Sequence, residues 1–249
     1  MRGWHVLITG GSAGIGLATA ELLAAKGFQI HLTGRSPEAL ARVRDNLGRD
    51  VYTYAGDIGK AEDRKELITR VRQNSGGRLD ALVINAARYG FQSLTDMSLS
   101  SVEAYFQTNT IGSWHLMKLA YPLLQAGEGK AVVMVSSTLG SRPIAGTGAY
   151  AASKAALNSL TQTFALEWAG EGIRVNAVLP GVVDTNIHEP QSENDPTKAE
   201  KFAQVGPMHP MGRVGQAQEV ATAIDFLLGS SSSWTTGSLF FVDGGISLV

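Results

Sequence analysis

The sequence contains no cysteine among its 249 residues. Disulfides, thiolate metal sites and thiol nucleophiles are therefore excluded, and the absence is typical of a reducing compartment. Charged residues make up only 17% of the chain and the formal net charge is −1, so there is no electrostatic basis for binding nucleic acid or an anionic membrane. The first apolar run, residues 6–8, is too short for a signal peptide or a membrane span. We therefore expect a cytoplasmic protein with no nucleic-acid or membrane partner.

Two common catalytic motifs are also absent. The five histidines include no HExxH or similar ligand spacing, so we predict no metal site. No Gly-x-Ser-x-Gly turn occurs, which disfavours a hydrolase.

Apolar, β-branched runs alternate with helical patterns along the chain. The expected strands are 5–9, 29–33, 51–55, 81–84, 131–136, 174–179 and 239–242. The expected helices are 15–26, 37–47, 60–74, 101–126, 150–169 and 217–228. Continuous apolar strands that alternate with helices indicate a parallel sheet covered on both faces. We predict one α/β domain over residues 1–249, a doubly wound Rossmann fold with a seven-stranded parallel sheet and ligands at the carboxyl ends of its strands.

A glycine-rich turn follows the first expected strand. The turn and the start of the following helix read Gly10, Gly11, Ser12, Ala13, Gly14, Ile15 and Gly16. A strand, a glycine turn and a helix N-terminus together form an anion site, because backbone N–H groups and the helix dipole point at a phosphate. The alternative is an ordinary glycine-rich turn, since the spacing differs from GxGxxG.

A second pattern joins three polar side chains. Tyr150 and Lys154 lie four residues apart and share one face if their segment is helical. The ammonium of Lys154 would then lower the pKa of the phenol, and Ser137, at the end of the preceding strand, would point into the same space. This arrangement suits proton transfer to or from a carbonyl or alcohol oxygen. Taken separately, Tyr150 could be a packed aromatic residue, Lys154 a solvated one and Ser137 a strand-end serine.

Together the two motifs resemble the short-chain dehydrogenase/reductase family in its compact single-domain form. The resemblance covers nearly the whole chain. Within the family, the chain is similar to 3-oxoacyl-[acyl-carrier-protein] reductases. Its further motifs are Gly56-Asp57-Ile58, Ile84-Asn85-Ala86-Ala87, Asn109, the segment 173–181 and Val242-Asp243-Gly244-Gly245. One departure is Ala87, where the family usually has glycine.

The resemblance implies roles for individual residues. Tyr150 would be the general acid or base, Ser137 would bind the carbonyl oxygen, and Asn109 would anchor a water chain from Lys154. Lys154, with the oxidised nicotinamide, would lower the pKa of Tyr150 and would hold the nicotinamide ribose. The implied cofactor-binding set is Gly10, Ser12, Ala13, Gly14, Ile15, Gly16, Arg35, Ser36, Asp57, Ile58, Asn85, Ala86, Ala87, Tyr150, Lys154, Pro180, Gly181, Val183 and Thr185.

The resemblance implies a specific contact with the nucleotide for three members of that set, and two of the three also have an ordinary structural explanation. Asp57 would accept from the adenine amino group, but aspartate also favours helix N-caps. Asn85 would lie beside the ribose, although asparagine also forms turns. Thr185 would bind the nicotinamide carboxamide.

The residue after the second strand bears on the choice of nucleotide. No acid follows this strand; Gly34 is followed directly by Arg35. An acid here binds the ribose 2′-hydroxyl of NAD, whereas an arginine accommodates a 2′-phosphate. We therefore expect NADP(H), with NAD(H) possible because Ala13 stands where many NADP-preferring relatives carry a basic residue. A solvated loop arginine is the alternative for Arg35.

The segment at about 186–210 breaks the strand–helix alternation with four prolines. We interpret it as a substrate lid, with a plain surface excursion as the alternative. Leu139 and Ile144, with Ser137 and Tyr150, are expected to line a mainly apolar substrate pocket. The resemblance implies a homotetramer, or less often a dimer, formed through helices 101–126 and 150–169 and the C-terminal segment.

These predictions describe an NADP(H)-dependent oxidoreductase that interconverts a ketone and a secondary alcohol. One alternative is a 3-oxoacyl-thioester reductase. Another is a non-catalytic dinucleotide-binding redox sensor, which the proton-transfer residues argue against because a sensor does not need them.

Overall fold

The computed structural model describes residues 3–189 and 197–249. Its main sheet contains β1 (His5–Thr9), β2 (Gln29–Gly34), β3 (Val51–Ala55), β4 (Ala81–Ile84), β5 (Ala131–Val135), β6 (Arg174–Pro180) and β9 (Leu239–Val242). The strands are ordered β3-β2-β1-β4-β5-β6-β9 and every neighbouring pair is parallel. The predicted doubly wound, seven-stranded parallel sheet is thus confirmed.

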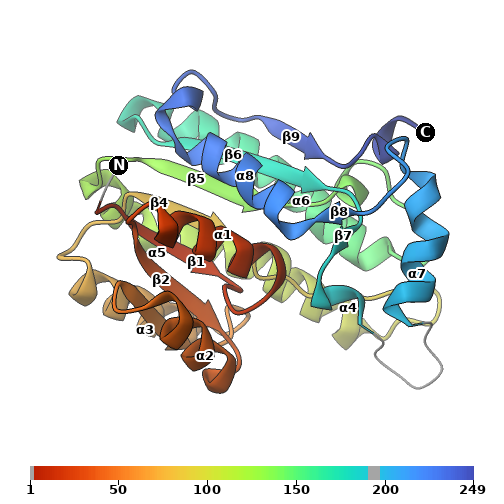
Figure 1. The fold of residues 1–249 in the computed structure, drawn as a ribbon, viewed down its shortest axis with the longest axis horizontal. Helices are drawn as coiled ribbons and strands as arrows, with labels where there is room; N and C mark the ends of the chain where they lie inside the picture. Colours follow the sequence, from red (N-terminus) through yellow and green to blue (C-terminus); the bar gives the residue numbers. More distant parts are fainter. Residues whose placement is uncertain (1–2, 190–196) are drawn as a thin grey trace.

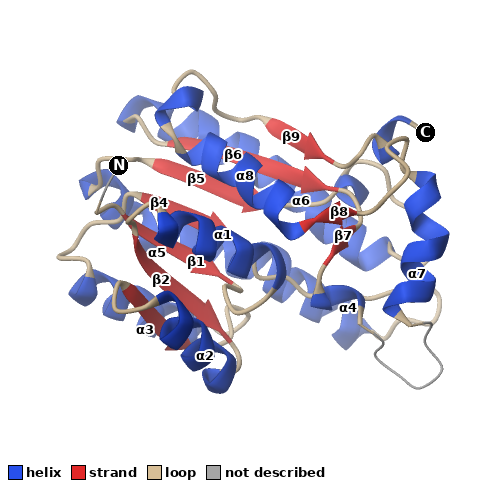
Figure 2. Cartoon of the chain, in the orientation of Figure 1, coloured by secondary structure: helices blue, strands red, loops and turns tan. Residues whose placement is uncertain are grey.

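Helices cover both faces of this sheet (Figures 1 and 2). They are α1 (Gly14–Ala25), α2 (Pro37–Leu47), α3 (Ala61–Asn74), α4 (Leu99–Phe106), α5 (Ser113–Ala126), α6 (Gly148–Trp168), α7 (Lys198–Val205) and α8 (Ala217–Leu228). One core cluster joins α1, α2 and α8 to the sheet, and a second joins α3, α5 and α6 to the opposite face. The central strands are continuously apolar because both faces of the sheet are buried.

Local sequence signals fix several helix ends. Ser36 caps α2 by accepting a hydrogen bond from the Ala39 N–H, and Pro37 occupies the first turn. A capping box formed by Gln216 and Glu219 begins α8. The observed bounds of these two helices equal the predicted ones.

The predicted helix 101–126 is wrong in its detail. Helix α4 begins at Leu99, and a π-helical turn at Gln107–Gly112 separates it from α5. Single π turns inside α-helices often occur at functional sites. Hydrophobic periodicity does not reveal the one-residue insertion, because both flanking helices keep their apolar faces inward.

The segment that we interpreted as a lid is not wholly irregular. Helix α7 forms within it, begun by a Thr197–Glu200 capping box, whereas residues 190–196 lie outside the described residues. Two short strands not predicted from sequence, β7 (Val183–Asp184) and β8 (Gly215–Gln216), pair in a separate small sheet. In Figure 1, β7, β8 and α7 all lie on the side where the arrowheads of the main sheet point.

None of the helices within the described residues is both long and apolar enough to cross a membrane.

Candidate active site

The turn between β1 and α1 fits a phosphate group. Gly10 and Gly14 have φ angles of +65° and +54°, which favour glycine. A Cβ on Gly16 would lie 2.3 Å from the Gly10 carbonyl oxygen, so the start of α1 packs directly on the turn. Ala13, at the helix N-cap, offers no side-chain cap, and the first turn carries no acid. The N–H groups there are therefore left for an anionic ligand.

This turn is held in place by Thr9 of β1 and by Asn85, which follows β4. The Asn85 side-chain amide donates to the carbonyls of Thr9 and Gly10, at 2.9 and 3.1 Å. The buried Thr9 hydroxyl in turn accepts from the N–H groups of Asn85 and Ala86. Asn85 therefore acts directly on the glycine turn. The support from Thr9 was not predicted, since nothing in the sequence distinguishes it from any threonine in a strand.

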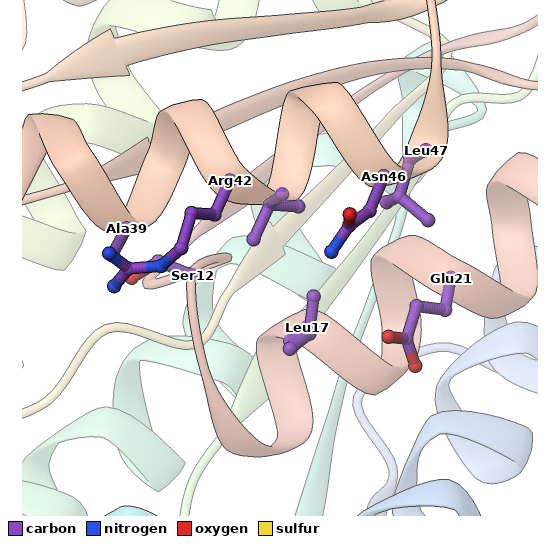
Figure 3. Close-up of a pocket in the computed structure, with 8 residues that line it drawn as sticks. Ser12, Leu17, Glu21, Ala39, Arg42, Asn46 and Leu47 are labelled. Carbon is purple, nitrogen blue, oxygen red and sulfur yellow. The ribbon is translucent and has the colours of Figure 1, made fainter.

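The carboxyl end of β2 lies next to the same turn. A Cβ on Gly34 would lie 3.1 Å from the Ser12 hydroxyl oxygen, and Arg35, the next residue, is exposed. A pocket of about 200 Å³ opens here between α1 and α2, lined by Ser12, Ala39 and Arg42 among others. Figure 3 shows the Arg42 side chain extending from α2 toward Ser12. Arg42 was not predicted from the sequence, because it lies inside α2 and outside every recognised motif.

Asp57, after β3, does not cap the following helix. Its carboxylate accepts from the Gly59 N–H at 2.8 Å, and Lys60 is the N-cap of α3. The Asp57 N–H donates to the Asp63 carboxylate at 2.8 Å. The buried Arg64 guanidinium donates to the Ile58 carbonyl and to His115. This network fixes the backbone of residues 57–59, and the expected N-cap alternative for Asp57 is wrong.

Ser137, Tyr150 and Lys154 meet at the carboxyl end of β5. Strand β5 ends at Val135, two residues before Ser137, which instead caps a 3-10 turn at Thr138–Gly140. Tyr150 and Lys154 lie one turn apart in α6, and the Lys154 Nζ is 5.8 Å from the centre of the Tyr150 ring. Lys154 donates to the Val135 carbonyl at 2.7 Å. All three side chains are buried, with exposed fractions of 7%, 7% and 2%.

Burial shifts the pKa values of Tyr150 and Lys154 in opposite directions. It raises the pKa of Tyr150 above its ordinary value, and a hydrogen bond with the Ser137 side chain acts in the opposite direction. Burial also lowers the pKa of Lys154 to about 7. In this structure burial outweighs any lowering of the Tyr150 pKa by Lys154, and the expected lowering by Lys154 together with the oxidised nicotinamide stays a prediction. The reason is that desolvation disfavours the phenolate and the ammonium alike.

Asn109 lies in the π-helical turn and is 1% exposed. Its amide oxygen accepts from the Arg88 N–H at 2.7 Å, and its amide nitrogen donates to the Arg88 carbonyl and the Ser153 hydroxyl, each at 2.9 Å. The side chain thus holds the segment after β4 against α6 and does not contact Lys154.

The segment after β6 completes the edge of the site. A Cβ on Gly181 would lie 3.0 Å from the Asp243 Cα, so Pro180 and Gly181 pack on the end of β9. Val183 is buried in β7. A Cβ on Gly14 would lie 3.1 Å from the Thr185 side chain, which brings Thr185 to the glycine turn. A pocket of about 340 Å³ lies beside this contact.

The two residues expected to line the substrate pocket differ in position. Leu139 packs against the cluster that contains Tyr105, Ala149 and Tyr150, whereas Ile144 is 58% exposed. The site also includes Tyr89, whose ring contacts Tyr150. Tyr89 was not predicted from the sequence, because it lies outside every recognised motif.

Comparison with known proteins agrees with this geometry. A family model described as "Enoyl-(Acyl carrier protein) reductase" matches residues 10–247. The chain is 36% identical over 253 residues to a tropinone reductase homologue of Arabidopsis thaliana, covering 100% of this chain and 92% of that protein. It is 32% identical over 251 residues to a tropinone reductase homologue of Datura stramonium, covering 100% and 93%.

Solved structures give the same result. An aldohexose dehydrogenase of Thermoplasma acidophilum superimposes with a TM-score of 0.88 at 30% identity, covering 100% of this chain and 95% of that one. A short-chain type dehydrogenase/reductase from Mycobacterium marinum gives a TM-score of 0.89 at 29% identity, covering 98% and 96%.

The fold and the site define a nucleotide-dependent oxidoreductase of the Rossmann type. The chain belongs to the short-chain dehydrogenase/reductase family. It is an enzyme that acts on a carbonyl or CH–OH group of a small molecule with an NAD(P)-type cofactor.

Proposed function

We propose that this enzyme interconverts a ketone and a secondary alcohol with NADP(H), and that Ser137, Tyr150 and Lys154 transfer the proton. The observation that carries the proposal is the convergence of these three buried side chains at the carboxyl edge of the sheet, the same edge at which the glycine turn follows β1. The nicotinamide cofactor, when bound, supplies or accepts the hydride. A non-catalytic redox sensor would have no use for the proton-transfer residues.

In the reductive direction Tyr150 donates its hydroxyl proton to the carbonyl oxygen. Burial raises the pKa of Tyr150, so the phenol is protonated at neutral pH and has a proton to donate. The Ser137 hydroxyl, which is close enough to Tyr150 to act on its pKa, is placed to donate to the same oxygen as negative charge develops. Lys154 can replace the proton that Tyr150 donates, because a pKa of about 7 lets its amine gain and lose a proton near neutrality.

Mutation of Tyr150 tests this assignment. Tyr150→Phe should reduce turnover at least 1000-fold, which corresponds to about 4 kcal/mol of transition-state stabilisation. The dissociation constant of the nucleotide should change less than about threefold, because the ring is retained. Turnover within tenfold of the wild type would reject the proton-transfer role. Comparing absorbance at 340 nm with a calorimetric nucleotide titration separates the two quantities.

The preference for NADP(H) over NAD(H) is supported by two arginines on the β2 side of the site. Arg35 follows β2 directly, and Arg42 extends toward Ser12 across the pocket in Figure 3. Guanidinium groups suit a phosphate dianion by charge and by geometry. We propose that both contact the 2′-phosphate.

Arginine variants test this preference. Arg35→Ala and Arg42→Ala should each weaken NADPH binding about 10- to 100-fold, as expected for a charged hydrogen bond of about 1.5–3 kcal/mol. NADH binding should stay within about twofold. Arg44→Ala is the matched control, since Arg44 lies on the same helix and pairs with Asp45 at 3.2 Å. Equal losses for both nucleotides would contradict a 2′-phosphate contact.

A 3-oxoacyl thioester is the second candidate substrate. It is supported by the solved structure titled as a putative betaketoacyl-ACP reductase, which superimposes with a TM-score of 0.86 at 31% identity. The carrier-bound thioester and a short ketone should both be assayed, and a higher kcat/KM for the thioester would decide for this alternative.

We also propose a homotetramer. Large apolar side chains are exposed on the helices expected to form its interfaces: Leu99, Ile111, Trp114 and Leu166. Further ones, Phe240 and Phe241, lie on the edge strand β9. Light scattering after size-exclusion chromatography should give about four times the 26.3 kDa chain mass. The expected location is the cytoplasm, although one relative is named as chloroplastic.

A further inference from the structure

Aromatic rings from four separate segments lie in a row that ends at Tyr150. The Tyr89 ring centre is 5.0 Å from that of Tyr150, with the planes at 89°. The His188 ring is 5.5 Å from Tyr89 at 72°, and Phe202 is 5.7 Å from His188 at 74°. Each successive pair thus meets edge to face, the geometry that aromatic rings favour.

Contacts of the two neighbouring residues, Arg88 and Gly90, hold the backbone on either side of Tyr89. Asn109 hydrogen-bonds both the N–H and the carbonyl of Arg88, the residue before it. Gly90, the residue after it, packs so closely that an added Cβ would lie 2.3 Å from the Tyr105 hydroxyl oxygen. The backbone on both sides of Tyr89 is therefore fixed, and its ring has a defined place over Tyr150.

The two rings at the other end of the row, His188 and Phe202, come from the segment around α7. His188 precedes the undescribed residues and Phe202 lies within α7. Lys201 donates to the His188 carbonyl at 3.2 Å, and Lys198 pairs with Asp184 and Glu189 at 2.8 and 3.3 Å. The two lysines of α7 are thus bound to protein groups.

The rings themselves carry no charge at neutral pH. Burial lowers the pKa of His188 to about 4 and raises the pKa of Tyr89 above its ordinary value. Both are neutral at pH 7. An anionic or cationic substrate group would therefore be desolvated beside Tyr150 without a charged partner among these rings, which is unfavourable.

Tyr89 is placed to contact a substrate bound at Tyr150, because the two rings meet with their centres 5.0 Å apart. Tyr150 is only 7% exposed, and Tyr89 and Leu139 are among the side chains packed against it. Resting on the function proposed above, we propose that Tyr89 and His188 form an aromatic slot that selects uncharged ketones whose carbonyl is attached to a flat ring. A flat ring stacks on one aromatic face and meets the edge of the next, whereas a puckered ring or an aliphatic chain gains only contact area.

Two ketones with the same carbon skeleton test the slot: acetophenone and cyclohexyl methyl ketone. The wild type should prefer acetophenone in kcat/KM by at least tenfold. Tyr89→Leu should raise the KM for acetophenone about 3- to 10-fold, as expected for the loss of one or two aromatic contacts, and should change the KM for the cyclohexyl ketone less than twofold. Tyr89→Phe should keep the preference, and His188→Leu should lose part of it.

A binding measurement and a control complete the design. Saturation-transfer NMR should detect acetophenone on the inactive Tyr150→Phe protein, and this signal should weaken when Tyr89→Leu is added. Tyr52→Leu is the matched control, because Tyr52 is a half-buried ring on the edge strand β3 stacked on His31. Thermal unfolding of each variant verifies that it is folded.

Each result counts for or against the slot. Equal use of both ketones by the wild type, or equal losses for both in Tyr89→Leu, would overturn it. If Tyr150→Phe stays active, the proposed function fails; if Tyr150→Phe is inactive and the wild type shows no preference, only the slot fails.

Discussion

Replacing Lys154 with methionine should make the protein more stable and inactive. Lys154 is 2% exposed, and burial lowers its pKa from 10.5 to about 7. The folded protein therefore disfavours the charged form that the unfolded chain prefers at neutral pH. Methionine has a similar length and no charge to desolvate, so the folded state should benefit from the change.

The size of the effect follows from linkage. The lowering from 10.5 to about 7 corresponds to about 5 kcal/mol against folding below pH 7. Between pH 7 and 10.5 the unfolded chain holds a proton that the folded protein has released, so the free energy of unfolding rises with pH. At pH 7 the penalty is about 4 kcal/mol. Subtracting about 1 kcal/mol for the hydrogen bond to the Val135 carbonyl leaves an expected gain of about 3 kcal/mol for Lys154→Met.

Urea unfolding of both proteins at pH 7 and pH 10, at one protein concentration, measures this gain. The difference between them should shrink from about 3 kcal/mol to below about 1 kcal/mol as the pH rises. Lys60→Met, at an exposed position, is the control variant. If Lys154→Met is less stable than the wild type at pH 7, or its advantage is the same at both pH values, the reasoning from burial is refuted.

Three further substitutions have defined outcomes. Gly16→Ala should lower the free energy of unfolding in urea by about 1–3 kcal/mol, because its Cβ would lie 2.3 Å from the Gly10 carbonyl oxygen; unchanged stability would contradict this contact. Arg174→Met removes hydrogen bonds to the carbonyls at the end of α8, so α8 should exchange amide hydrogens faster, with a loss of about 3 kcal/mol. Asn109→Ala removes the bonds to Arg88 and should reduce kcat/KM about tenfold for acetophenone; full activity would show that Tyr89 needs no such support.

Much of the fold could be predicted because its signals are local. Each main strand is a short apolar run bounded by polar or turn residues, so all seven were predicted to within one residue at either end. Helix α2 begins where Ser36 and Pro37 require it to begin. The π-helical turn at Gln107–Gly112 could not be predicted in this way, because an inserted residue leaves the apolar pattern on either side intact.

The grouping of the site residues was partly visible as well. Tyr150 and Lys154 are one helical turn apart, so their spacing alone brings these two side chains together. The pKa shifts of Tyr150 and Lys154 could not be predicted from the sequence. Spacing predicts that the ammonium acidifies the phenol, whereas burial in the packed structure raises the pKa of Tyr150 and lowers that of Lys154.

The sequence by itself therefore determined the succession of strands and helices, the glycine turn after β1 and the one-turn spacing of Tyr150 and Lys154, since each depends on residues close together in the chain. Only the tertiary structure decided that Arg42 extends toward Ser12 and that the Tyr89 ring packs on the Tyr150 ring. It also decided that the side chains of Tyr150 and Lys154 are buried away from water. These features arise where segments distant in sequence pack against one another, and the resulting exclusion of water is a property of the packed whole.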